Sequence, residues 1–154
     1  MGISMIGSRL PVDQWQAVIE DPGRAWRVLD DPGIHLQKSW QGLHYLLTGT
    51  RGRVSAGVGS AILGGTEIGE DPGYGPPRLL TPDEVAAVAS ALDATDPPTL
   101  RARYDPEVLE EADVYPGAWP DKGFDDFLGP YYDALRDFYR SAAAGGQAVI
   151  MALT

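Results

Sequence analysis

The chain has 154 residues, 44% of them apolar, and a formal net charge of −10 at pH 7, which predicts one acidic globular domain over residues 1–154. The absence of cysteine excludes disulfides, thiolate nucleophiles, iron–sulfur clusters and thiolate zinc sites, and two histidines are too few for a three-histidine metal site. Because only 12 residues are Lys or Arg and no basic run occurs, we expect neither a nucleic-acid nor a membrane partner.

The first third of the chain predicts one strand followed by short helices. Residues 3–9 are typical of an opening strand, and apolar residues at helical spacing predict a helix over 12–20. Asp21 can cap a second short helix, because its carboxylate accepts hydrogen bonds from free backbone amides. We expect another helix with Ser39 as its local cap and Gly49 as its C-terminal stop.

That helix carries the histidine on which the functional interpretation depends. Trp40, Leu43, His44 and Leu47 are spaced i, i+3, i+4 and i+7, so they share one face. In one interpretation, His44 is a buried neutral imidazole that ties the helix to the glycine-rich loop after it. In the other, His44 faces a pocket and moves protons near neutral pH.

The middle of the chain is rich in glycine and gives few structural signals over 49–77, apart from a short helix at 59–63. Residues 78–80 are expected to be extended. The segment Thr81–Glu84 forms a capping box, with proline at the first helical position, and predicts a helix that ends at about Leu92.

The last third predicts more helices and a final strand. Helices are expected over 99–104, 106–112 and 131–142, and a buried strand over 147–153. Strands at both ends with helices between them indicate an α+β fold, with a small mixed β-sheet built from the N- and C-terminal strands. We expect these two strands to pair near the centre of the sheet and several short helices to cover it.

The common cofactor and nucleotide motifs fail in this sequence. The segment 59–66, GSAILGGT, nearly fits the phosphate loop, but Gly65 stands where that loop needs its lysine. The dinucleotide pattern also fails, because Ile62 stands where it needs its third glycine. No nucleophile elbow and no calcium loop occur. We therefore expect no cofactor and no metal.

Amphipathic rings and charges recur along the middle of the chain, and they predict one pocket. Such groups line concave sites, where a few polar atoms orient a ligand against apolar walls. The candidate pocket residues are Lys38, Trp40, His44, Glu67, Tyr74, Arg78, Asp113 and Tyr115.

Four segments are similar to the YfbM-like family of small bacterial proteins, a family of unknown function: KSWQGLHYLLTG, AILGGTEIG, YGPPR and DVYPGAW. The similarity runs from the opening MGISMIG to the final strand. The resemblance implies a compact α+β sheet protein and no particular reaction. The family pattern matches Lys38, Trp40, Gly42, Leu43, His44, Gly64, Gly65, Gly69, Tyr74, Gly75, Pro76, Arg78, Tyr115 and Pro116. Ser39 and Gln41 stand where many relatives have Ala and His.

Three classes of function remain open from the sequence. The chain is a domain that binds a small anionic or polar ligand, an acidic protein that binds a basic partner such as a toxin, or an enzyme with His44 as general base and Arg78 as anion clamp. We rank binding or interaction above catalysis, because no nucleophile, metal set or cofactor motif is found. No apolar run approaches the roughly 20 residues that span a bilayer, and no signal-peptide pattern occurs. We expect a cytoplasmic protein.

Overall fold

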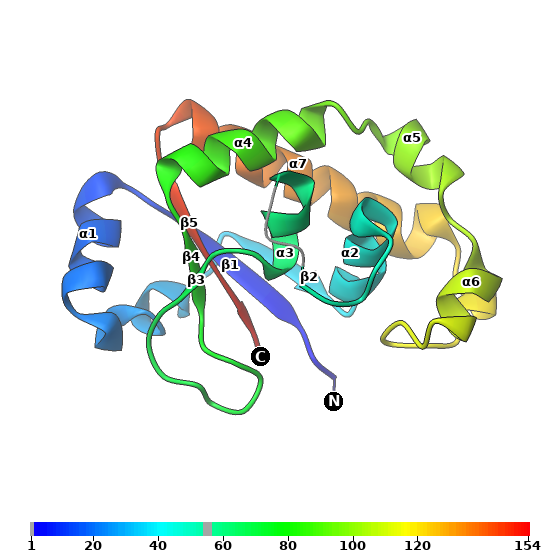
Figure 1. Cartoon of the computed structure of the whole chain (residues 1–154), viewed down its shortest axis with the longest axis horizontal. Helices are drawn as coiled ribbons and strands as arrows, with labels where there is room; N and C mark the ends of the chain where they lie inside the picture. Colours follow the sequence, from blue (N-terminus) through cyan, green and yellow to red (C-terminus); the bar gives the residue numbers. More distant parts are fainter. Residues whose placement is uncertain (1, 54–56) are drawn as a thin grey trace.

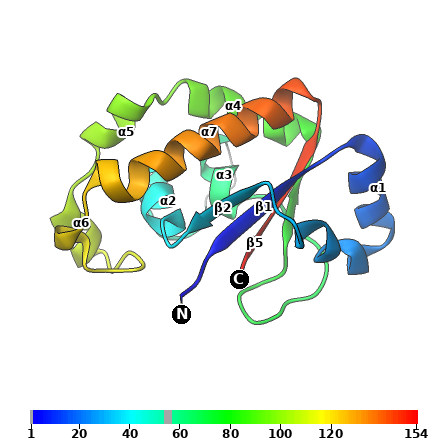
Figure 2. The same cartoon turned by 180° about the vertical axis from the view of Figure 1, so that it is seen from behind.

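Five strands form one sheet in the part of the chain that the computed structural model describes, residues 2–53 and 57–154 (Figure 1). The strand order is β2-β1-β5-β4-β3, and helical segments pack on both faces (Figure 2). The α+β prediction is confirmed. The strands are β1 (Met5–Leu10), β2 (Ile34–Gln37), β3 (Thr66–Glu67), β4 (Arg78–Leu80) and β5 (Ala148–Leu153).

The first and last strands of the chain pair near the centre of the sheet, as expected. β1 and β5 run antiparallel in register from Met5 opposite Leu153 to Leu10 opposite Ala148. Every pairing among the described residues is antiparallel, whereas we expected a mixed sheet. The sequence could not predict strand direction, because a buried strand shows the same apolar pattern in either orientation.

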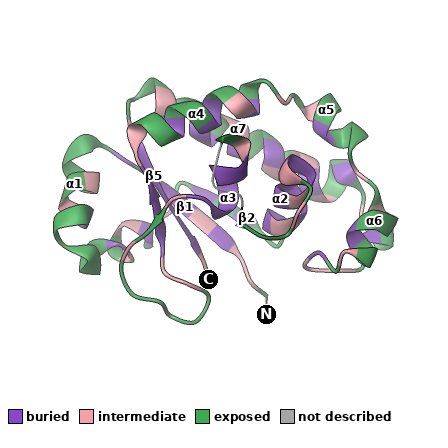
Figure 3. Ribbon diagram, in the orientation of Figure 1, coloured by how far each residue is buried: buried purple, intermediate pink, exposed green. Residues whose placement is uncertain are grey.

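The sheet separates two hydrophobic cores of unequal size. Successive side chains of a strand point to opposite faces, so β5 sends Val149 and Met151 into the larger core and Ala148, Ile150 and Ala152 into the smaller one. Figure 3 shows most of β5 and the inward sides of α2 and α4 as buried, whereas much of α1 is exposed.

Helical segments follow the same division. The smaller core is covered by α1 (Val12–Glu20) and the 3-10 turns η1 (Pro22–Arg24) and η2 (Arg27–Leu29). The larger core is built with α2 (Trp40–Thr48), η3 (Gly57–Gly59), α3 (Ser60–Leu63), α4 (Pro82–Asp93), α5 (Pro97–Ala102), α6 (Pro106–Glu111), η4 (Trp119–Asp121), the π-helical turn η5 (Phe124–Leu128) and α7 (Gly129–Ala144). No helix within 2–53 or 57–154 has both the length and the apolar character needed to cross a membrane.

Several local predictions are confirmed in detail. α1 has the predicted bounds, and the Asp21 side chain accepts a hydrogen bond at the start of η1. Gly49 ends α2 with φ at +79°, a left-handed conformation that glycine adopts without strain. The capping box before α4 is formed in both directions, from Glu84 N–H to Thr81 Oγ1 and from Thr81 N–H to Glu84 Oε1.

Two caps differ from the expectation. Ser39 precedes α2 without capping it, because its hydroxyl donates a hydrogen bond to the Leu36 carbonyl at 2.6 Å. α5 begins two residues earlier than expected, at Pro97. The Asp96 side chain caps it by accepting from Thr99 N–H at 2.9 Å, and proline takes the first helical position.

The strand β2 was missed from the sequence. Its side chains alternate, with Ile34 and Leu36 buried and His35 and Gln37 exposed. An alternation over only four residues is too short to distinguish a strand from an irregular segment. β2 pairs with β1 at one edge of the sheet, and α7 of the larger core contacts it.

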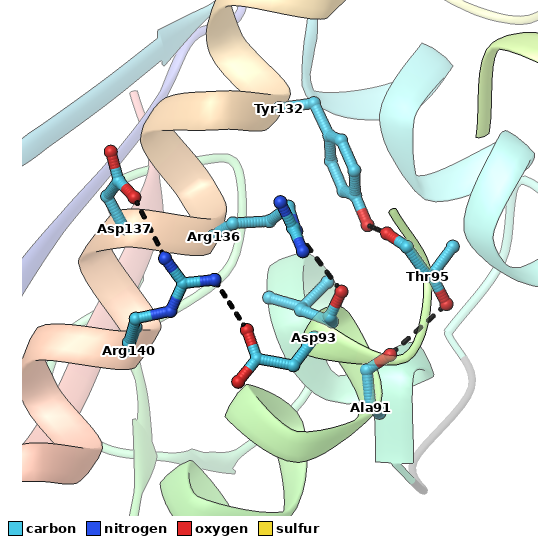
Figure 4. Close-up of polar contacts among 8 residues, drawn as sticks. Ala91, Asp93, Thr95, Tyr132, Arg136, Asp137 and Arg140 are labelled. Atoms are coloured by element: carbon cyan, nitrogen blue, oxygen red, sulfur yellow. Dashed lines mark hydrogen bonds and ion pairs between the residues drawn. The ribbon is translucent and has the colours of Figure 1, made fainter. Parts of the chain in front are cut away.

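α4 and α7 pack against each other over the sheet, and polar side chains join them at one side (Figure 4). Arg140 pairs with the Asp93 carboxylate at 2.8 Å and with Asp137 at 3.6 Å. Arg136 Nε donates to the Leu92 carbonyl at 3.2 Å. Both arginines of this contact therefore have a partner for their charge or their N–H groups.

Candidate functional site

A cleft of about 290 Å³ lies between α2, the loop after it, β4 and the loop that leads into β4. Its walls are mostly apolar and are formed by Trp40, Leu63, Tyr74, Pro76 and Leu153. Its charged lining consists of three arginines and one carboxylate: Arg51, Arg53, Arg78 and Glu67. The cleft therefore concentrates positive charge in a chain whose net charge is −10.

Arg78 is the buried cation of the cleft. It lies on β4 with its side chain on the larger-core side of the sheet, and only 6% of the residue is exposed. Its Nη2 is 4.0 Å from the sulfur of Met5, which is a weak acceptor. Burial, and next the positive charge of Arg53, lower the pKa of Arg78 to about 10, while Tyr139 and the Glu67 carboxylate act in the opposite direction. The guanidinium is thus held in an unfavourable environment for its charge.

The carboxylate nearest to Arg78 in the sheet is turned to another arginine. Glu67 on β3 is the direct register partner of Arg78 on β4. Its carboxylate instead accepts a hydrogen bond from Arg53 Nη1 at 3.1 Å, while Arg53 Nη2 donates to the Gly65 carbonyl. Within residues 2–53 and 57–154, no carboxylate lies within 4.0 Å of the Arg78 guanidinium.

Arg51 is also partly neutralised, by a residue outside the cleft. Its Nη1 donates to the Asp113 carbonyl at 3.1 Å and lies 3.8 Å from the Asp113 carboxylate. The Asp113 side chain is 98% exposed, so this ion pair is weak in water. Arg51 and Arg53 each face a carboxylate, whereas Arg78 does not.

His44 is buried behind the residues that line the cleft. It is 1% exposed and is not among the residues that line the cleft. Its Nε2 lies 2.6 Å from the carbonyl oxygen of Gly52, and we assign the proton to Nε2 so that the ring donates. Burial lowers the pKa of His44, the bond to Gly52 opposes this shift, and the charge of Arg78 lowers the pKa further. A neutral imidazole therefore ties α2 to the loop that carries Arg51 and Arg53.

Trp40 forms a fixed aromatic wall, and Tyr74 forms a more exposed one. Trp40 Nε1 donates to the Ile3 carbonyl at 3.0 Å, and its ring packs against Tyr115 with centroids 5.9 Å apart. The Tyr115 hydroxyl accepts from Ile3 N–H at 2.8 Å, which holds this ring as well. Tyr74 is 54% exposed, and it also borders a second hollow of about 430 Å³ that Tyr115 lines. Tyr115 thus stands behind Trp40.

The structure brings half of the predicted pocket residues into one cleft. Trp40, Glu67, Tyr74 and Arg78 line it. His44 and Tyr115 lie directly behind its lining residues, through the contacts to Gly52 and Trp40. Lys38 and Asp113 do not line it. The side chain of Lys38 is exposed and lies beside Gly2, and Asp113 reaches only the outer side of Arg51.

The sequence analysis missed the two arginines of the segment RGR, 51–53. A usable signal was present, because two cations stand directly after the helix stop at Gly49 in a strongly acidic chain. Leu153 was missed for a different reason. It belongs to the terminal strand β5, and only the pairing of the sheet brings it to the cleft.

In the described part of the chain, no three His, Asp or Glu side chains gather closely enough to hold a metal ion. The chemistry that the cleft offers is the binding of an anion by guanidinium groups beside aromatic and aliphatic walls.

Comparisons with known proteins agree with the resemblance found in the sequence. A family model described as "Domain of unknown function (DUF1877)" matches residues 1–152. A crystal structure of a protein of unknown function, YfbM from Escherichia coli, is similar with a TM-score of 0.69 and 21% identity, and the match covers 98% of this chain and 99% of that one. A search of curated proteins finds no match. The similarity to the solved structure supports the fold, and the resemblance to the YfbM-like family is confirmed.

Proposed function

Because the chain belongs to the DUF1877 family of unknown function, we propose a function from the cleft itself: the protein is a binding domain that holds a small anionic ligand, with Arg78 as the main contact to the anion. The observation that supports this proposal most strongly is a buried guanidinium that lines a cleft and has no carboxylate within 4.0 Å among the described residues. Burying an uncompensated charge destabilises a folded protein. An anion in the cleft would compensate that charge.

The surroundings of Arg78 favour an external anion over an internal partner. Glu67 is the only carboxylate that lines the cleft in the described part of the chain, and it is paired with Arg53 at 3.1 Å. The remaining lining close to Arg78 is largely apolar, so an anion would meet little competition from water there. The Arg fork can donate two parallel hydrogen bonds to one anionic group.

Catalysis by His44 is not supported by the geometry. The alternative enzyme hypothesis needs His44 to reach a substrate as a general base. Its ring is 1% exposed, and Nε2 is used in the contact with Gly52. We therefore place His44 among the residues that position the loop, and we prefer binding to catalysis. Neutralisation of a basic partner remains supported only by the net charge.

Thermal unfolding with simple anions tests the proposal. The wild-type protein would be heated in sodium chloride, acetate, formate, sulfate or phosphate at equal ionic strength. An anion that binds the native state raises Tm, and the gain grows with the logarithm of its concentration once that concentration exceeds Kd. We expect at least one oxyanion to raise the Tm of the wild type above the chloride value, and Arg78→Met to remove this gain.

A matched control is Arg24→Met. Arg24 lies in η1, outside the cleft lining, with a half-exposed side chain that pairs with Asp21. This variant should keep the full response to the oxyanion. The proposal fails if no oxyanion exceeds chloride, or if Arg78→Met responds as strongly as the wild type.

A further inference from the structure

We propose that the ligand of this cleft is a small carboxylic acid with an apolar, preferably aromatic, body, and that the cleft rejects phosphorylated compounds. This inference rests on the anion-binding function proposed above and adds the chemical class of the ligand. Three features support it: the net charge of the cleft, the apolar walls and the position of Glu67.

Two of the three arginines that line the cleft face a carboxylate, although the pair of Arg51 with the exposed Asp113 is weak. Arg53 is paired with Glu67 and Arg51 faces Asp113, so among the lining cations only Arg78 lacks a carboxylate within the described residues. One guanidinium matches one carboxylate in charge and in the geometry of two parallel hydrogen bonds. A phosphate monoester carries almost two negative charges at neutral pH, so one free cation would leave it undercompensated.

Glu67 adds a penalty against a dianion. As the register partner of Arg78, it places a carboxylate at the cleft, hydrogen-bonded to Arg53 and more than 4.0 Å from the Arg78 guanidinium. Two like charges close together in a partly buried site repel each other. A monocarboxylate meets this repulsion once, whereas a phosphate dianion meets it about twice as strongly. The Glu67 side chain thus acts as a selectivity element.

The walls of the cleft fit a compact apolar group. Trp40 and Tyr74 offer rings, and Leu63, Pro76 and Leu153 offer aliphatic surface. Trp40 is held by Ile3 and Tyr115, so its surface is preorganised for contact. The volume of about 290 Å³ lies at the lower limit of known ligand sites, roughly 300–1,000 Å³, and suits a single ring with a short acidic side chain.

Calorimetric titration with four matched probes tests the inference. Phenylacetate has the proposed chemistry, phenylacetamide lacks its charge, acetate lacks its apolar body, and phenyl phosphate replaces the carboxylate by a dianion at pH 8. We expect phenylacetate to bind the wild type about tenfold or more tightly than phenylacetamide and acetate, the loss expected for one charged hydrogen-bonding group or one buried ring. We also expect it to bind more tightly than phenyl phosphate, whose second negative charge lacks a partner.

Two variants separate the causes. Arg78→Lys keeps the charge but loses the two-point fork, and we expect it to weaken phenylacetate by about tenfold, while Arg24→Lys has no effect. Glu67→Gln removes one carboxylate and leaves Arg53 free. We expect it to strengthen phenyl phosphate more than phenylacetate. Glu67 is exposed, so this variant should fold even if a change at Arg78 does not.

The outcomes distinguish this inference from the proposed function. Tighter wild-type binding of phenyl phosphate than of phenylacetate would overturn the carboxylate class and leave anion binding intact. Equal affinity for acetate and phenylacetate would overturn the claim that the ligand has an apolar body. Equal affinity for phenylacetate and phenylacetamide would overturn the claim that the ligand needs a negative charge. If Glu67→Gln strengthens both anions equally, Glu67 is not a selectivity element. No binding of any anionic probe, together with no oxyanion effect on Tm, would end both proposals.

Discussion

The contact between α4 and α7 and the cleft at β4 both contain arginines, but the charges of these arginines lie in opposite environments. Between the helices, Arg140 pairs with Asp93 and also with Asp137 of its own helix, and the hydrogen bond that Arg140 donates to the Asp93 carboxylate raises the pKa of Arg140 (Figure 4). In the cleft, burial lowers the pKa of Arg78 to about 10, and Met5 sulfur is its weak partner. The first arrangement stabilises charges that are already in water, and the second holds a charge away from water.

The difference separates a structural role from a binding role. An arginine that only joins two elements can sit at the surface and use a nearby carboxylate, as Arg140 does with half of its side chain exposed. A buried arginine without a carboxylate lowers stability unless something else compensates it. Sites that hold such strain are typical of function, because selection keeps them despite their cost. The same reasoning gives four testable expectations.

The largest effect is expected at the cleft itself. Arg78→Met should raise the free energy of unfolding by about 1–3 kcal/mol in chloride buffer, because it replaces a buried, poorly compensated cation by an apolar side chain next to Met5. Urea unfolding at constant pH measures this change. A clear loss of stability would show that Arg78 has a structural partner in solution, and the contrast with Arg140 would no longer hold.

The next effect concerns His44 and depends on pH. His44→Phe leaves the Gly52 carbonyl without its donor, which should cost about 1–2 kcal/mol at pH 8. The folded pKa of His44 lies below 6.5, so the unfolded chain binds the proton more readily. Wild-type stability from this group is complete above pH 6.5 and decreases as pH falls toward the lowered pKa.

The difference in the free energy of unfolding between the wild type and His44→Phe should therefore become smaller below pH 6.5. Parallel urea titrations from pH 8 to pH 5 would follow it, since the two proteins share every other titrating group. His35→Phe is the matched control, because His35 is exposed on β2. A gap that widens in acid would mean that the native state favours the charged imidazole.

A smaller effect is expected in the contact between α4 and α7. The hydroxyl of the fully buried Tyr132 donates to the Thr95 carbonyl. Tyr132→Phe removes this bond and keeps the ring, so we expect a loss of about 1 kcal/mol. Tyr131→Phe, on the same helix but less buried, serves as the comparison. An unchanged midpoint in urea for Tyr132→Phe would mean that water replaces the lost donor.

The smallest effect is expected at the exposed ion pairs. Arg140→Gln removes both contacts to Asp93 and Asp137, yet the groups are exposed and screened by salt. We expect no measurable shift of Tm at physiological ionic strength and a small decrease at low salt. A loss larger than that of Tyr132→Phe would show that the surface pairs carry the contact between the two helices.

The candidate pocket could be predicted in part because its residue types are unusual in this chain. Aromatic rings and cations near the glycine-rich middle indicated Trp40, Tyr74 and Arg78, and these do line one cleft. Lys38 and Asp113 have equally suitable chemistry, but they point to solvent. Composition identifies which side chains can bind a ligand, whereas their direction depends on backbone positions that the sequence does not display.

Local physical chemistry in the sequence was sufficient for most of the helices, several of their caps and the apolar terminal strands. The capping box at Thr81, the stop at Gly49 and the bounds of α1 depend on residues within a few positions of each other, so no distant contact is needed to form them. The antiparallel direction of the sheet, the edge strand β2 and the state of Arg78 depend on residues far apart in the chain. The pairing of β3 with β4 makes Glu67 the register partner of Arg78. The Glu67 carboxylate is nevertheless paired with Arg53, which lies after α2. The guanidinium is left without a carboxylate because long-range packing controls both steps, and no short segment encodes either of them.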